Sequence, residues 1–359
     1  MEYFIGFIVL LGILIFVHEF GHFIVAKLVG VKVLKFSLGF VSSIVKRKWG
    51  ETEYMLGWLP LGGYVKLLGE DPESDEKVPE EDRHRAFTSK PLWARVAVVF
   101  AGPLSNYLLA VVVLSIGYMA GWPVLTSEIG KVLDGTPAKE AGLKSGDRIT
   151  AIDGRPVWRW EDMRRMIEKS PGNRLNIRIE RDGIEEDMSV TPQVSDQVGI
   201  LGEPVGRIGV GPSGKTVTLG PAAALYEGAR FTGELTRLVV VTLVNLVKGK
   251  VSAKALSGPI TIIQASGESL KAGVFNFLFL LSYISINLAI INLLPVPILD
   301  GGHLLFFAIE AVIRRPVTGK VREVAVQAGL LFIVFLMGLV IYNDVSRIIT
   351  QGWSLTPGQ

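Results

Sequence analysis

Cysteine is absent from this chain of 359 residues, and histidine occurs only four times. The lack of cysteine excludes disulfide bonds and thiolate metal sites, so any zinc must be held by histidine and carboxylate. An excess of one charge is also missing, because the formal net charge is only +3 and the basic residues are not gathered into one patch. The charge pattern therefore argues against a nucleic-acid partner.

Apolar residues are abundant: they make up 49% of the chain, and the mean hydropathy is +0.41. A bilayer-spanning helix needs about 20 apolar residues, and four segments meet this requirement: 3–26, 93–119, 274–294 and 324–341. A further apolar run at 238–247 is short for a span and predicts an interfacial helix. The first residues lack the positive start of a cleavable signal peptide, so the first span is expected to be retained.

Positive charge is concentrated in the loops after the first and third spans. The residues concerned are Lys27, Lys32, Lys35, Arg95, Arg314, Arg315, Lys320 and Arg322. Since positive loops stay in the cytoplasm, both chain ends and the segment 120–273 are expected on the outer side.

The first cytoplasmic loop carries a β-like pattern. Residues 31–68 alternate short β-like runs with glycines at turn positions, and Trp49-Gly50 suggests a hairpin tip. The acidic stretch 70–82 predicts a solvated, flexible link. His84, beside that link, is expected to be an exposed loop residue without a metal role.

A catalytic pattern lies within the first span, at His18-Glu19-Phe20-Gly21-His22. Two histidines four residues apart share one face of a helix and can bind one metal ion. Glu19 can then deprotonate a water molecule held there. Polar residues in a lipid-facing helix cost on the order of 2–4 kcal/mol each, so a functional role is favoured over a structural one. The pattern predicts a zinc hydrolase that acts within the membrane.

A catalytic zinc needs a third protein ligand, and Asp300 at the cytoplasmic end of the third span is the best candidate. Pro295 and Pro297 interrupt the helix before it, and the freed backbone groups can be satisfied by an extended peptide. Paired glycines beside Asp300 let the backbone approach closely. His303 is a competing ligand, although a hydrogen-bonding or packing role is favoured for it.

Residues 122–213 form a compact pattern of short strands and two helices, with a turn at Asp182-Gly183. The run from Thr136 to Ile149 (T-P-A-x-x-A-G-L-x-x-G-D-x-I) resembles the PDZ domains of bacterial proteases. Such domains usually bind an extended peptide, often a free C-terminus, by strand addition. The carboxylate loop of permuted PDZ domains is similar to a late segment that contains Gly206, Ile208 and Gly209. A folded spacer that only limits access is an equally weighted alternative.

Together, H-E-F-G-H, a PDZ-like module and N-x-x-P-x-P-x-L-D-G-G resemble the site-2 protease family of intramembrane zinc metalloproteases, in the bacterial regulator of sigma-E protease branch. The resemblance implies one Zn²⁺ held by His18, His22 and Asp300, with Glu19 as general base. It also implies a substrate-binding role for a second set of residues: Asn287, Asn292, Pro295, Pro297 and Gly39, the last within a membrane-associated β-hairpin that pairs with substrate.

The expected fold is a polytopic α-helical membrane protein with about four transmembrane helices, a membrane-associated β-hairpin region and one extracytoplasmic PDZ domain of the α+β class. The expected divisions are 1–30 (first transmembrane helix), 31–92 (β-rich loop and acidic link), 93–120 (second helix), 122–213 (PDZ domain), 214–273 (extracytoplasmic or interfacial helical segment), 274–311 (third transmembrane segment), 312–323 (cytoplasmic link), 324–343 (fourth helix) and 344–359 (outer tail).

The expected activity is cleavage, in the bacterial cytoplasmic membrane, of single-pass membrane proteins after a first extracytoplasmic cut. Anti-sigma factors and remnant signal peptides are the substrate types that the resemblance implies, with membrane lipid as surroundings. Two features depart from the family pattern: there is room for one PDZ domain rather than two, and Gly39-Phe40-Val41 replaces Gly-Phe-Gly. The alternatives are a non-catalytic PDZ membrane adaptor and, because broken helices also line ion pathways, a transporter.

Overall fold

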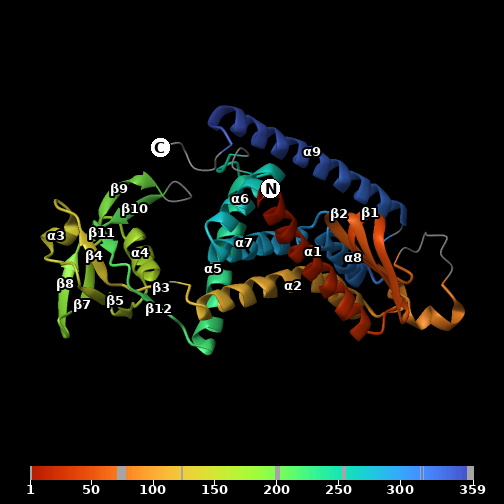
Figure 1. The fold of residues 1–359 in the computed structure, drawn as a ribbon, viewed down its shortest axis with the longest axis horizontal. Helices are drawn as coiled ribbons and strands as arrows, with labels where there is room; N and C mark the ends of the chain where they lie inside the picture. The colour runs from red at the N-terminus through yellow and green to blue at the C-terminus, as the bar shows by residue number, and fades with distance from the viewer. Residues whose placement is uncertain are drawn as a thin grey trace. The chain divides into compact units, whose positions relative to one another are not determined.

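The computed structural model describes residues 2–70, 78–122, 124–198, 203–252, 256–315, 317 and 319–353 (Figure 1). The chain divides into two compact units. Unit 1 comprises Met1–Ser115, Leu225–Leu246 and Ser252–Gln359, and unit 2 comprises Ile116–Ala224 and Val247–Val251. Unit 1 contains most of the apolar helices, and unit 2 contains the predicted PDZ-like module.

The longer helices are α1 (Glu2–Leu28), α2 (Leu92–Met119), α5 (Pro221–Val247), α6 (Pro259–Lys271), α7 (Val274–Asn292), α8 (Asp300–Ile313) and α9 (Gly319–Gln351). Of these, α1, α2, α7 and α9 overlap the four predicted spans. Among the described residues, α1, α2, α7 and α9 are long and apolar enough to cross a membrane. The outer tail was predicted to begin at residue 344, but α9 continues to Gln351. The predicted interfacial run 238–247 is the last part of α5.

The core of unit 1 lies where α1 meets α2 and α7. Leu10 and Leu14 of α1 are fully buried against Val113 of α2 and Phe277 and Leu281 of α7. Burial of each such side chain contributes roughly 1.5–3 kcal/mol relative to exposure in water, although lipid weakens this term. The contact between these helices therefore depends mainly on how closely their side chains fit together.

A two-stranded unit formed by β1 (Val33–Trp49) and β2 (Thr52–Leu67) follows α1. The turn lies at Gly50, whose φ of +61° suits glycine, so the predicted hairpin tip is confirmed. Residue Lys35 pairs with both Glu53 and Lys66, which shows that each long strand is bent and contributes two paired segments. The sheet therefore has the four short runs that the sequence pattern predicts.

Ion pairs attach this sheet to the end of α1. Glu51 accepts hydrogen bonds from Lys27 (2.5 Å) and Arg85 (2.6 Å), and Lys32 is paired with Asp82. Two 3₁₀ turns, η1 (Glu80–Arg85) and η2 (Phe87–Ser89), follow the acidic link.

Residues 71–77 of the link lie outside the described residues. Among the described residues of the link, residues 79–81 are exposed, and Asp82 is half-buried in an ion pair with Lys32.

Unit 2 is built on a four-stranded sheet in the order β6-β5-β7-β8. Its strands are β3 (Val124–Leu125), β4 (Ile129–Val132), β5 (Arg148–Ile152), β6 (Arg155–Pro156), β7 (Leu175–Arg181), β8 (Ile184–Val190), β9 (Gln193–Val198), β10 (Pro204–Arg207), β11 (Val210–Pro212) and β12 (Thr216–Val217), and its helices are α3 (Pro137–Glu140) and α4 (Trp160–Glu168). Alternating Ile177 and Ile179 of β7 pack with Met163 and Ile167 of α4. The short strands, the two helices and the turn at Asp182-Gly183, which joins β7 to β8, agree with the predicted pattern.

The last part of α9 and the residues after it contact α6 and the start of α1. Asp344 of α9 is buried and accepts hydrogen bonds from the backbone N–H groups of Gly258, Ile260 and Thr261, so it caps the start of α6. Buried Gln264 of α6 donates a hydrogen bond from its side chain to the Trp353 carbonyl, after the end of α9. The Trp353 ring packs edge-on against Tyr3.

Candidate active site

Three polar side chains converge within unit 1. His18 and His22 lie one turn apart on α1, and Asp300 is the first residue of α8. The Oδ2 atom of Asp300 lies 3.2 Å from Nε2 of His18 and 3.7 Å from Nε2 of His22, and the two Nε2 atoms are 3.3 Å apart. The structure thus brings together all three predicted metal ligands.

This triangle has the dimensions of a zinc site. Bonds of about 2.1 Å in a tetrahedron place neighbouring ligand atoms about 3.4 Å apart, which matches the three distances. Oδ2 of Asp300 is buried and has no hydrogen-bond partner among the described residues. A buried carboxylate oxygen requires a partner, and a cation between the three atoms would supply it. The donor set therefore fits zinc.

The second ring nitrogen of His22 has a partner that fixes its orientation. Nδ1 lies 2.8 Å from the carbonyl oxygen of Val98 on α2. Since a carbonyl only accepts, Nδ1 carries the hydrogen, and in the neutral ring Nε2 then presents its lone pair to Asp300 and His18. The arrangement is the usual one for a histidine that binds metal. Nδ1 of His18 lies 3.2 Å from the amide of buried Asn106.

Glu19 lies between the sheet and the three candidate ligands. Its side chain is half-buried, and the charges of His18, His22 and Asp300 act on it. The backbone of β2 passes close to it, since a Cβ atom added at Gly63 would lie 2.8 Å from Cγ of Glu19. Glu19 thus lies close enough to the ligand triangle for their charges to interact, and its role as general base stays a prediction.

Glycines make the close approach of these elements possible. An added Cβ at Gly102 of α2 would lie 2.2 Å from Nε2 of His22, so only glycine leaves room for the ring. At Gly301 and Gly302, an added Cβ would lie 2.2 Å and 2.3 Å from the carbonyl oxygens of Leu294 and Val296. The paired glycines thus let the interrupted segment fold back on α8, as predicted.

The predicted substrate-binding residues lie around this interruption or in the sheet. Asn292 ends α7, Pro295 is exposed and Pro297 is half-buried between α7 and α8. The Asn287 side chain donates to the Tyr283 carbonyl of its own helix at 2.8 Å. Gly39 lies in the bend of β1, with φ of +87°. Their predicted contact with substrate stays a prediction.

The two remaining histidines take no part in the ligand triangle. His84 is exposed, as expected. Nδ1 of His303 lies 3.2 Å from a guanidinium nitrogen of Arg322 on α9, so the favoured hydrogen-bonding role is the one observed.

The predicted peptide loop of unit 2 lies at the end of α4. An added Cβ at Gly206 would meet the carbonyl oxygen of Ile167 at 2.5 Å. Ile208 is buried in the core, and Gly209 has φ of +84°. Because the Ile208 side chain is in the core, only its backbone can face a peptide.

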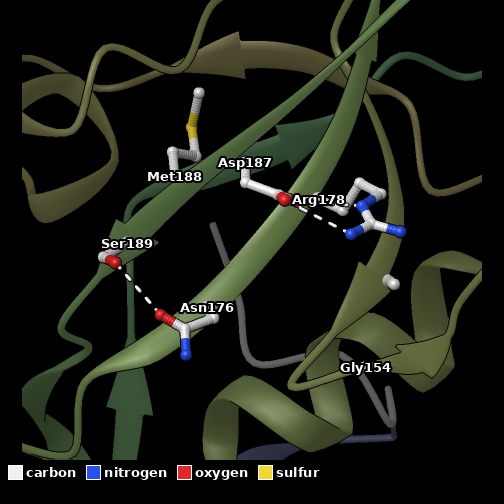
Figure 2. A pocket seen from close by; sticks show the side chains of 7 residues that line it. Gly154, Asn176, Arg178, Asp187, Met188 and Ser189 are labelled. Atoms are coloured by element: carbon white, nitrogen blue, oxygen red, sulfur yellow. Dashed lines mark hydrogen bonds and ion pairs between the residues drawn. The ribbon is translucent and has the colours of Figure 1, made fainter.

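A separate hollow of about 330 Å³ lies over β7 and β8 (Figure 2). Its polar groups are paired with each other: Arg178 with Asp187 at 2.8 Å, and Ser189 with Asn176 at 3.1 Å. None of the three predicted loop residues lines it. The hollow therefore adds nothing to the predicted peptide site.

Three contacts of the site were not predicted: those of Val98, Gly102 and Asn106. Asn106 carried a detectable signal, because an amide within the apolar run 93–119 is costly in lipid and marks function or packing. The contact from Val98 had no such signal, since it uses only a backbone carbonyl.

Comparison with known proteins identifies the class. The model of peptidase family M50 matches residues 6–336. The chain therefore belongs to peptidase family M50, the site-2 protease family, and is a site-2-type zinc metalloendopeptidase of the bacterial inner membrane.

Individual relatives cover nearly the whole chain. A predicted zinc metalloprotease of Agrobacterium fabrum is 35% identical over 97% of this chain and 96% of its own length. The regulator of sigma-E protease RseP of Salmonella typhimurium is 33% identical over 96% of this chain and 98% of its own length. That alignment spans 448 positions, so RseP carries sequence that this chain lacks.

Among solved structures, the chain is similar to the PDZ domain of an SdrC-like protein from Listeria monocytogenes. The identity is 23%, the TM-score is 0.20, and the match covers 24% of this chain and 84% of that chain.

Proposed function

We propose that this chain binds one zinc ion through His18, His22 and Asp300 and cleaves a peptide bond within the transmembrane segment of a membrane protein. The convergence of three ligand atoms, with a buried Oδ2 of Asp300 that accepts no hydrogen bond from the described residues, carries the proposal. The substrate is a single-pass protein already shortened outside the membrane, of the anti-sigma factor or remnant signal peptide type.

Glu19 is the general base of the proposed reaction. When bound, zinc makes water nucleophilic near neutral pH and stabilises negative charge on the scissile carbonyl. Glu19 takes the proton from the attacking water and then passes it to the leaving amine. Its position next to His18 in the chain and the close approach of Gly63 to its Cγ atom support this role.

The substrate is proposed to unwind beside the interruption between α7 and α8. A carbonyl inside a helix is hydrogen-bonded and shielded, so it must be released before attack. Asn287, Asn292, Pro295 and Pro297 are the residues proposed to line this place. The bend of β1 near Gly39 would add the released strand to the sheet.

Unit 2 is proposed to act as a PDZ domain on the outer side, where both chain ends would also lie. The backbone around Gly206, Ile208 and Gly209 would receive a peptide C-terminus. The alternative is that unit 2 only restricts access of substrates that have not been trimmed.

Cleavage of a tagged transmembrane peptide by the purified full chain tests the enzymatic part. Zinc content and turnover are measured together, with and without chelator. We expect His18→Gln to lose both zinc and cleavage, and Glu19→Gln to keep zinc but lose cleavage. His84→Gln changes an exposed histidine and serves as the matched control.

Retained proteolysis in Glu19→Gln would refute the assigned base. Full zinc content in His18→Gln would refute the ligand set. Zinc binding by the unmodified chain without turnover of any trimmed membrane peptide would instead favour the adaptor.

A further inference from the structure

Asn106 is the buried polar side chain that contacts a candidate ligand from outside the triangle. It lies on α2, is fully buried, and places Nδ2 3.2 Å from Nδ1 of His18. Its Oδ1 atom has no hydrogen-bond partner among the described residues. A buried amide oxygen normally accepts a hydrogen bond, so this arrangement requires an explanation.

The ring of His18 specifies what Asn106 must provide. Nε2 of His18 faces Asp300 and His22, so in a metal-bound state that atom presents its lone pair. A neutral histidine then carries its hydrogen on Nδ1, which needs an acceptor. Val98 provides one to His22. An NH₂ group at His18 would instead place hydrogen against hydrogen.

We propose that Asn106 is a positioning residue for His18: in the zinc-bound protein, its amide oxygen accepts the hydrogen bond from Nδ1–H. The two ends of an amide have nearly the same shape, so exchanging them requires no repacking. The exchange gives the amide oxygen a donor, places the NH₂ group where the oxygen lay, and holds the ring in the orientation that directs Nε2 at the metal.

The position of Asn106 is set from two sides. Ser285 of α7 donates its hydroxyl hydrogen to the Asn106 backbone carbonyl at 2.7 Å. One turn earlier on α2, Gly102 lies against both histidine rings. Asn106 therefore joins α7, α2 and the metal-binding face of α1, and this placement suits a group that fixes a ligand.

Zinc affinity, measured by competition with a chromophoric chelator on the full chain in detergent, tests the inference. Asn106→Leu keeps the shape but has no acceptor, and we expect affinity to fall about 10–100-fold. Asn106→Asp keeps an acceptor oxygen in the same place, and affinity should stay within a few-fold of the unmodified chain. Ser285→Ala, which removes only the backbone anchor, should have a smaller effect than Asn106→Leu.

Wild-type affinity in Asn106→Leu, or equal losses in the Leu and Asp variants, would overturn the proposal. A readout that needs no variant is the ¹⁵N spectrum of the four histidines in the zinc-loaded chain: His18 must be protonated at Nδ1, and an unprotonated Nδ1 also overturns the proposal. The inference rests on the proposed zinc site. If His18→Gln lost zinc while Asn106→Leu did not, only the inference on Asn106 would fail.

Discussion

At Gly102, α2 touches the rings of both candidate ligand histidines, and there is no room for a methyl group. The nearest atoms to an added Cβ are Nε2 and Cε1 of His22, followed by Cε1 of His18 at 2.9 Å. A residue without a side chain thus determines how closely α2 supports the metal-binding face of α1.

Gly102→Ala should weaken zinc binding strongly, because the rings must move away from the triangle that they form with Asp300. Overpacking of this kind costs about 1–3 kcal/mol, and we expect zinc affinity to fall by at least tenfold in a chelator competition. Gly12→Ala, in the same helix as the histidines but with open space around it, is the matched control. Equal affinity in both variants would contradict this account.

The contact between Glu51 and its two cationic partners predicts a dependence on pH. Partial burial raises the pKa of the Glu51 carboxyl, but hydrogen bonds from Lys27 and Arg85 outweigh this and hold the pKa below its usual range. A lowered pKa in the folded state means that the pair stabilises the fold above the unfolded pKa, and that this contribution disappears as pH falls through the folded value.

Glu51→Gln should therefore destabilise the protein at pH 7 by about 0.2–1 kcal/mol, the range for partly exposed ion pairs. The difference from the unmodified chain should shrink as the pH falls below about 4. Thermal unfolding in detergent at pH 7 and pH 3 measures it, with Glu53→Gln as a control for removing a charge from β2. If the stability difference between Glu51→Gln and the unmodified chain grew towards pH 3, the predicted direction of the pH dependence would be refuted.

At the scale of elements, α8 is attached to α2 by a largely buried ion pair. Arg95 of α2 binds Glu310 of α8 through two hydrogen bonds of 2.5 and 3.1 Å, and its guanidinium lies 5.2 Å from the centre of the Phe307 ring. Because Asp300 begins the same helix, this pair helps to set where the candidate carboxylate ligand lies.

Removing one partner of the Arg95–Glu310 pair should destabilise the protein more than removing both. Arg95→Met leaves a buried carboxylate unpaired, which costs about 3–5 kcal/mol, whereas Arg95→Met with Glu310→Met should recover most of the loss. Thermal unfolding and zinc affinity of the two single variants and the double variant form the test. Additive losses would show that the two residues act independently.

The predictable elements are those whose pattern is local. The spans follow from apolar length, and the tip at Gly50 follows from turn chemistry. The buried position of Asp344 could not be predicted, because the carboxylate accepts hydrogen bonds from the start of α6, more than 80 residues earlier in the chain. The half-buried position of Asp82 likewise depends on the distant Lys32.

The candidate site was predictable where residue type reveals chemistry and unpredictable where only backbone or shape is used. His18, Glu19, His22 and Asp300 carry groups that have few other roles in an apolar segment. The carbonyl of Val98 and the missing side chain of Gly102 leave no chemical signature. Asn106 lies between these cases, since its amide is conspicuous but its partner becomes visible only when α1 and α2 pack together.

At the scale of the whole molecule, the pairing of β3 with β12 shows where most of unit 2 can be deleted. β3 and β12 pair, with Leu125 opposite Thr216, so replacing residues 126–215 by Asn-Gly should leave a two-residue hairpin. If unit 2 restricts access, the shortened chain should cleave a trimmed peptide at a similar rate and also cleave a substrate with an intact outer domain. Continued discrimination between the two substrates, at normal zinc content, would contradict that role.

The contact between Tyr3 and Trp353 brings the first turn of α1 beside residues that follow α9. Two residues that lie at the same surface of a bilayer are joined by a chain that crosses it an even number of times. Among the described residues, the helices long and apolar enough to cross are α1, α2, α7 and α9, an even number. We therefore predict that α5, where Leu235 packs with Ala110 and Ile286, adds no single further crossing.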